Sequence, residues 1–236
     1  GGASDIIEIA GSDNIALGDG GKITFVAGDD RGLSYGESAG EEQIDRVQTN
    51  SDEHGDNDKI TVGDGANIIF GGAGSDLLQA GAGDDIMVGD GGYVQFANGQ
   101  VVRVSNIGQN LGGDDLIIAG AGHNTVLGGV GNDTIITGID GAKLEHFADI
   151  SEPDIAQGIE DLSFTLRNDA SFDREAYTNQ RDLVLGDTGI ITVGGTADLI
   201  SASEKAAIGL SDSDLQDTGI VSFNFQGAAS NGLSSS

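Results

Sequence analysis

Aspartate and asparagine side chains recur every nine residues along much of this chain. Residues 62–88 read VGDGANIIF, GGAGSDLLQ and AGAGDDIMV, which are three nine-residue units in a row. Position six of each unit is Asp or Asn, and position eight is apolar. Ten units share this register, and their sixth positions are Asp5, Asn14, Asp58, Asn67, Asp76, Asp85, Asp115, Asn124, Asp133 and Asp182. Oxygen-bearing side chains in a fixed register are candidate metal ligands.

Stacking would give these side chains a shared chemistry. If each unit is a turn plus a short strand, two units of nine residues make one coil of 18. Asp58 and Asp76 are then stacked neighbours on one edge, and Asn67 and Asp85 on the other. Carboxylates at the ~4.8 Å strand spacing repel each other, and a divalent cation between coils reverses the sign of that interaction. Several Ca²⁺ ions are predicted, because Ca²⁺ accepts roughly 6–8 oxygen ligands in flexible geometry.

Glycines are expected to supply the other ligands. Glycine reaches positive φ, which lets a tight turn direct its carbonyls inward. Asp64 and Asp90, at position three of their units, are weaker candidates, and an exposed turn acid is the equal alternative for both. Gly-Asp and Gly-Asn also form turns without metal, but the tandem run favours ligation. The candidate carbonyl donors are Gly63, Gly65, Gly72, Gly74, Gly81, Gly83, Gly120, Gly122, Gly129 and Gly131.

The strands that position these turns follow from position eight, which is apolar in all ten units. One inward side chain per unit is typical of a short strand on a thin core. The unit resembles the nonapeptide G-G-x-G-x-D-x-U-x of the RTX (repeats-in-toxin) family. The resemblance covers residues 53–92 and 110–137 well, and the start and residues 178–193 loosely. It implies an all-β fold, a right-handed parallel β-roll (a β-solenoid) that binds calcium at its turns.

Composition supports such a solenoid. The chain has 236 residues, 41 glycines, no cysteine, 5% aromatics and a net charge of −29. An ordinary globular core needs more bulky apolar side chains, whereas a solenoid buries only a thin strip per coil. Disorder is the alternative for the metal-free chain. The acidity excludes nucleic-acid binding through phosphates, and the chain has no apolar run long enough for a membrane span.

Insertions interrupt the repeats. The segment from Val47 aligns with the segment from Val104 without a gap. YVQFANGQVVRV predicts a β-hairpin around Asn98-Gly99. The insertion at about 22–52 is expected to be a loop, and that at about 141–180 to hold a short helix capped by Ser151. The predicted organisation is an interrupted β-roll at 1–193, with insertions at about 22–52, 93–109 and 141–180, and a C-terminal cap or linker segment at 194–236.

Motifs for catalysis are weak. Residues 32–36 match the G-x-S-x-G nucleophile elbow, but they lie in a loop-like polar stretch without the required strand and helix. His54, His123 and His146 are too widely spaced for a zinc motif. The protein is therefore expected not to be an enzyme.

Two functions remain open. The first is a non-catalytic, calcium-dependent extracellular structural or adhesive protein, such as an adhesin or a component of a surface layer, matrix or filament. The alternative is the calcium-binding β-roll module of a secreted hydrolase or toxin. The interruptions favour the first, because accessory rolls tend to be continuous. The resemblance implies type I secretion from a Gram-negative bacterium, and folding on calcium outside the cell. Open coil ends predict head-to-tail self-association, with a cell-surface or matrix partner as a further possibility.

Overall fold

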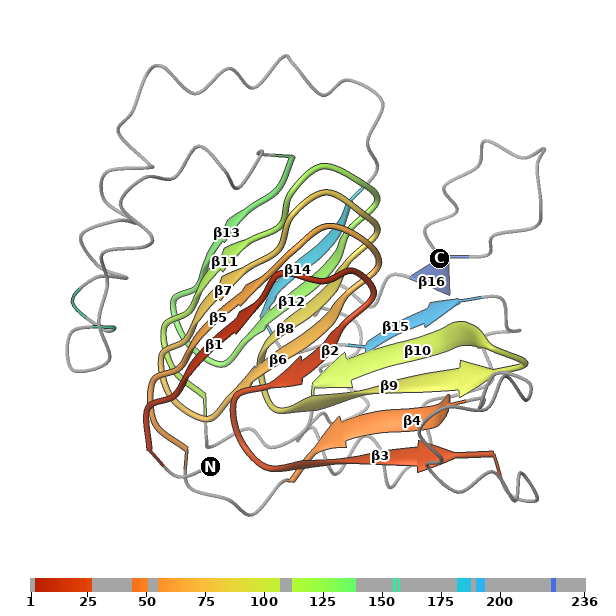
Figure 1. Ribbon diagram of the computed structural model, residues 1–236, viewed down its shortest axis with the longest axis horizontal. Coiled ribbons are helices and arrows are strands. Elements are labelled where there is room, and N and C mark those ends of the chain that lie inside the picture. The colour runs from red at the N-terminus through yellow and green to blue at the C-terminus, as the bar shows by residue number, and fades with distance from the viewer. Residues whose placement is uncertain are drawn as a thin grey trace, which may run out of the picture.

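The computed structural model describes residues 3–26, 44–50, 55–106, 112–138, 155, 157, 182–187, 190–193 and 222–223. These residues form an all-β structure of two parallel sheets and a third, mostly antiparallel sheet (Figure 1). Within them, no helix is long and apolar enough to cross a membrane.

The two parallel sheets lie face to face, and the chain alternates between them. One has the order β1 (Ile6–Ile9), β5 (Lys59–Val62), β7 (Leu77–Gln79), β11 (Leu116–Ile118) and β13 (Thr134–Ile136). The other has the order β14 (Leu183–Asp187), β12 (Thr125–Gly129), β8 (Ile86–Asp90), β6 (Ile68–Gly72) and β2 (Ile15–Leu17). One strand of each sheet with the turn between them makes a coil, such as β5 with β6.

Register explains the core. Position-eight residues pair across neighbouring coils, as Ile60 does with Leu78 and Ile69 with Met87. Between the sheets, these residues form one buried cluster, which Ile7 and Ile135 partly cover. Val184, at the end of the second sheet, is 44% exposed. The inward direction predicted for position eight is thus confirmed in the coils that have neighbours on both sides.

The third sheet is built from the insertions. Its order is β16 (Ser222–Phe223), β15 (Ile190–Val193), β10 (Gln100–Asn106), β9 (Gly92–Ala97), β4 (Ile44–Thr49) and β3 (Gly21–Phe25). A second apolar cluster joins it to the second parallel sheet, with Val47 and Val94 packing near Phe70 and Val88. The insertions therefore extend the fold sideways (Figure 1).

The hairpin prediction is confirmed, and the first loop prediction is wrong at both ends. Asn98 and Gly99 have φ of 53° and 74°, as a type I′ turn requires, and join β9 to β10. The expected loop at 22–52 begins and ends with β3 and β4, which pair with each other. The rest of that insertion, most of 141–180 and nearly all of 194–236 lie outside the described residues; Ile155 and Gln157, within the expected helix, are helical.

Candidate metal centre

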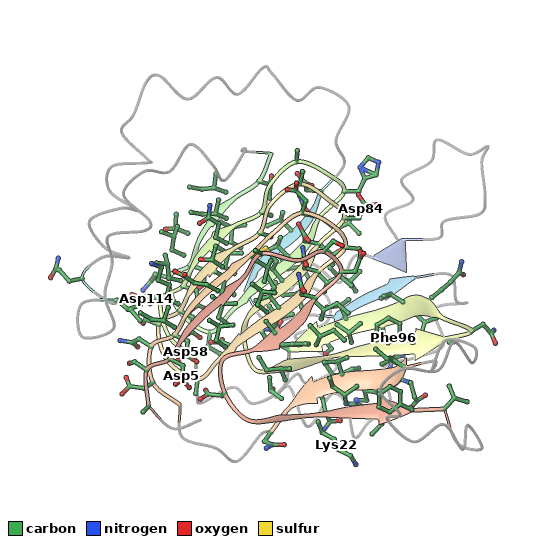
Figure 2. All side chains as sticks on the ribbon, in the orientation of Figure 1. Asp5, Lys22, Asp58, Asp84, Phe96 and Asp114 are labelled. Carbon is green, nitrogen blue, oxygen red and sulfur yellow. The ribbon has the colours of Figure 1, made fainter. Side chains whose placement is uncertain are left out.

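One edge of the paired parallel sheets carries a continuous column of aspartates, here called the Asp edge: Asp5, Asp58, Asp76, Asp115 and Asp133. Each backbone N–H donates to Oδ1 of the next aspartate in the column. The N···O distances are 2.7 Å from Asp5 to Asp58, 2.7 Å from Asp58 to Asp76, 2.7 Å from Asp76 to Asp115 and 3.0 Å from Asp115 to Asp133. Figure 2 shows Asp5 and Asp58 together at this edge. The predicted stacking of Asp58 on Asp76 is present.

The second oxygen of these carboxylates is buried without a hydrogen bond. This holds for Oδ2 of Asp58, Asp76 and Asp115, whose side chains are almost fully buried. A buried charged oxygen without compensation is costly, so something other than a protein donor must balance it. Three such oxygens lie in successive coils of one column.

Burial also changes the acidity of the column. The pKa of Asp58 is raised to about 7: loss of solvent is the main cause, and neighbouring carboxylates such as Asp19 add to it against the lowering effect of the backbone hydrogen bond. Burial raises the pKa of Asp76 and Asp115 well above the usual range, and nearby aspartates add to the effect. At neutral pH, the edge therefore holds either protons or a cation.

Glycine leaves room for that cation. The fourth residue after each position-six residue opens the turn at the opposite edge, and we call it the turn-opening residue. At the Asp edge these are Gly18, Gly71, Gly89, Gly128 and Gly186. A Cβ on Gly71 would come under 3.0 Å from both Asp76 Oδ2 and Gly89 O. Carboxylate and carbonyl oxygens of neighbouring coils thus converge beside this glycine.

The same convergence occurs four times along the Asp edge. The carboxylate oxygen and carbonyl pairs are Asp58 with Gly71 beside Gly18, Asp76 with Gly89 beside Gly71, Asp115 with Gly128 beside Gly89, and Asp133 with Gly186 beside Gly128. All these donors are oxygens, the ligand type that Ca²⁺ prefers. No three acidic or imidazole side chains cluster within the described residues, so backbone carbonyls must complete any site. The residues present fit calcium.

The opposite edge is built differently, and we call it the Asn edge: Asn14, Asn67, Asp85, Asn124 and Asp182. Its ladder has the same direction, with N···Oδ1 distances of 3.0, 3.0, 3.1 and 2.9 Å along the column. The predicted stacking of Asn67 on Asp85 is therefore present too. Asp84, one residue before Asp85, is labelled on this side in Figure 2.

Asparagine amides at this edge donate to turn carbonyls that the sequence analysis assigned to metal. Asn67 Nδ2 donates to Gly63 O and Gly65 O, both at 3.0 Å, and Asn124 Nδ2 donates to Gly120 O at 3.0 Å. Of the ten predicted carbonyl donors, seven have positive φ as expected: Gly65, Gly72, Gly74, Gly83, Gly122, Gly129 and Gly131. The other three, Gly63, Gly81 and Gly120, do not.

Position-five side chains add an outer ladder that runs the opposite way. Ser75 N–H donates to Asn57 Oδ1 at 2.8 Å, Asp114 N–H to Ser75 Oγ at 3.0 Å, and Asn132 N–H to Asp114 Oδ1 at 2.8 Å. In the pair Asp114–Asp115, the first acid is thus an exposed turn acceptor, and only the second belongs to the buried column.

The two position-three candidates have different environments. Asp64 is exposed at the Asn edge, where its Oδ1 accepts the Ala82 N–H at 2.8 Å. Asp90 is buried at the Asp edge, where it accepts the N–H groups of Gly113 and Val130, and burial raises its pKa to about 7. The turn-acid alternative thus describes Asp64, whereas Asp90 adds charge to the Asp edge.

Sequence reasoning missed two sets of oxygens. Asp19 Oδ2 accepts the Ala73 N–H at 2.7 Å, and Asp19 is buried as Asp90 is. The shared tripeptide Gly-Asp-Gly at 18–20 and 89–91 was the available signal. The carbonyls of the turn-opening glycines were also missed, because position one was not considered as a donor.

Comparison with known proteins agrees with this geometry. Residues 55–93 and 111–140 match the family described as RTX calcium-binding nonapeptide repeat, in four copies. No curated protein and no solved structure matches the chain. The matched ranges contain the central coils of both edges. Residues 55–93 and 111–140 of this chain are therefore RTX calcium-binding nonapeptide repeats.

Proposed function

We propose that the protein is a non-catalytic, calcium-dependent extracellular structural or adhesive protein. In this proposal, the paired parallel sheets are a right-handed β-roll that folds when calcium loads the Asp edge. The observation that carries the proposal is the set of buried Oδ2 atoms of Asp58, Asp76 and Asp115, which have no hydrogen bond and converge with turn carbonyls.

Calcium would supply positive charge to the buried carboxylates of the Asp edge, whose oxygens would coordinate it. The chain carries a net charge of −29, and backbone N–H groups of neighbouring coils bind the carboxylates of the column. The residues of the chain do the positioning: Oδ1 of each aspartate is fixed by the preceding coil, so Oδ2 is held toward the turn-opening glycine. Folding and calcium binding are then one equilibrium.

The third sheet favours a structural or adhesive role over an accessory module of an enzyme or toxin. Both hairpins, β3–β4 and β9–β10, leave the coils after an Asp-edge turn-opening glycine and form a surface beside the parallel sheets (Figure 1). A spacer for a catalytic domain has no need of such a surface. We further propose secretion, as is typical of RTX proteins, and head-to-tail self-association through the end strands of the parallel sheets.

The test is folding in calcium and in chelator. Circular dichroism should show a β spectrum in excess CaCl₂ and a largely disordered chain in EDTA, and equilibrium dialysis should show bound ions. An unchanged β signal in excess chelator, together with no bound calcium, would rule out the proposal. Light scattering in calcium then separates an assembling structural protein from a monomeric module.

A further inference from the structure

We infer that the two edges are not equivalent toward calcium: the Asp edge takes the ions, and at the Asn edge asparagine carboxamides replace them. This inference rests on the proposed calcium binding and adds where the ions go. Asn14, Asn67 and Asn124 were predicted above to be calcium ligands. In this inference their side-chain amides instead take the place of the ion, by donating hydrogen bonds to the turn carbonyls.

The first observation is the direction of the amides. Asn67 Nδ2 donates to Gly63 O and Gly65 O, and also to Asp85 Oδ1 at 2.8 Å. These turn carbonyls, which would coordinate a cation at a metal-loaded turn, accept N–H groups instead. The partners fix this orientation, because Asn67 Oδ1 accepts the Asn14 N–H at 3.0 Å. A flipped amide would place like groups together at both ends.

The pattern repeats along the edge. Asn14 Nδ2 donates to Gly11 O at 2.8 Å and to Asn67 Oδ1 at 2.9 Å. Asn124 Nδ2 donates to Gly120 O, while Asn124 Oδ1 accepts the Asp85 N–H. Each amide Nδ2 therefore donates to a carbonyl of its own turn without any ion. The Oδ1 of Asn67 and of Asn124 also accepts an N–H of the preceding coil, and Asn14 Nδ2 also donates to the side chain of Asn67.

The second observation is independent and concerns space. Turn-opening residues of the Asp edge are glycines, and a Cβ on Gly18, Gly71, Gly89 or Gly128 would collide with a carboxylate oxygen and a carbonyl. At the Asn edge, the turn-opening residues are Ile9, Val62, Ala80, Ala119 and Thr137. Val62, Ala80 and Ala119 are buried in the core cluster between the sheets. Residues with side chains therefore stand, at the Asn edge, where glycines stand at the Asp edge.

Asp85 is the informative exception. It lies between Asn67 and Asn124, and its Oδ2 is buried without a hydrogen bond. Its turn opens with Ala80, a residue of the core cluster, rather than with a glycine. We therefore expect no ion at Asp85, although its side chain has the same chemistry as Asp76.

A reciprocal exchange of isosteric side chains tests the inference. The number of ions bound per chain is counted by equilibrium dialysis with CaCl₂ for the intact chain and for Asp76→Asn, Asp85→Asn and Asn67→Asp. We expect one ion fewer for Asp76→Asn, and no change for Asp85→Asn or for Asn67→Asp, whose turn opens with Val62. In EDTA, Asn67→Asp should lose residual β structure, because it removes the amide donors.

Other outcomes are equally decisive. One ion fewer for Asp85→Asn, or one ion more for Asn67→Asp, would show that the Asn edge can take calcium and would overturn the inference. If the intact chain binds no calcium, the proposed function fails instead, and the two failures are thus distinguishable. If Asp76→Asn or Asn67→Asp does not fold, Asp133→Asn and Asn14→Asp make the same exchange near the ends of the two columns. One ion fewer and no change are then the expected results.

Discussion

Filling the space beside one carboxylate should remove one ion while leaving every ligand in place. Gly71→Ala places a methyl group under 3.0 Å from Asp76 Oδ2 and Gly89 O, without removing an oxygen. The control is Gly186→Ala, which changes the equivalent turn-opening glycine at the end of the same edge, where a Cβ meets no described residue within 4 Å. The two variants are chemically identical and differ only in what the methyl group meets.

The magnitude follows from linkage. An ion that binds only the folded chain stabilises it by about 2.7 kcal/mol when its concentration is 100 times the dissociation constant. Overpacking adds about 1–3 kcal/mol to the loss. Gly71→Ala should therefore lower the free energy of unfolding by about 4–6 kcal/mol in saturating calcium, a large part of the roughly 5–15 kcal/mol typical of a domain.

The slope against calcium is the sharper readout. Each ion adds about 1.4 kcal/mol of stability per tenfold rise in calcium above its dissociation constant. Urea unfolding at several calcium concentrations should show this slope falling by about 1.4 kcal/mol per decade in Gly71→Ala and not in Gly186→Ala. Equal slopes in the two variants would refute the reasoning, since the methyl group would then act through packing or backbone entropy alone.

Three further predictions concern other parts of the molecule. Burial raises the pKa of Asp58 and Asp90 to about 7, so the metal-free fold is favoured while these groups are protonated. Its stability should fall as the pH rises from about 4 through 7. Circular dichroism in EDTA should show more β structure at pH 5 than at pH 8, and the reverse order would contradict this prediction. Gly99→Ala, at a φ of 74°, should destabilise the β9–β10 turn by about 1 kcal/mol in thermal melts and leave the calcium slope unchanged. Self-association in calcium stays a prediction: light scattering should show assemblies that EDTA dissolves, and a strictly monomeric species at high concentration would count against it.

The repeat period made the parallel sheets predictable. Position eight alone predicts which side chain of each strand points into the core. The spacing of 18 residues predicts that Asp58 stacks on Asp76. The third sheet was harder to predict from the sequence. Its strands β4 and β9 pair although about half of the nine-residue units lie between them, and the alternation of apolar and polar residues in β4 is short. The polar middle of the 22–52 insertion dominated the expectation of a loop, although IDRVQT at its end has strand character.

The difference between the two edges was hidden by treating Asn and Asp as one kind of ligand. Both offer an Oδ1 that accepts the same backbone N–H, which is why both fit the register. Only Asn adds donors, and their effect depends on where the turn carbonyls lie, which the sequence does not show. Asp64 and Asp90 were likewise treated as one kind of candidate, although they differ in place. Asp90 follows its turn-opening residue by one position and Asp64 by two, and the two turns lie on opposite edges.

The direction of the inner ladder gives the stack a polarity. In both columns, the position-six N–H of one coil donates to the coil that follows it in sequence, as Asp58 N–H does to Asp76 and Asn67 N–H to Asp85. A coil added at the N-terminal end meets acceptors that are already in place, whereas one added at the C-terminal end must supply them itself. The stack therefore acts as a one-way template, in which each coil offers ordered acceptors to the coil that precedes it in sequence. Seeds made from the last coils should speed the ordering of earlier ones, and seeds from the first coils should not.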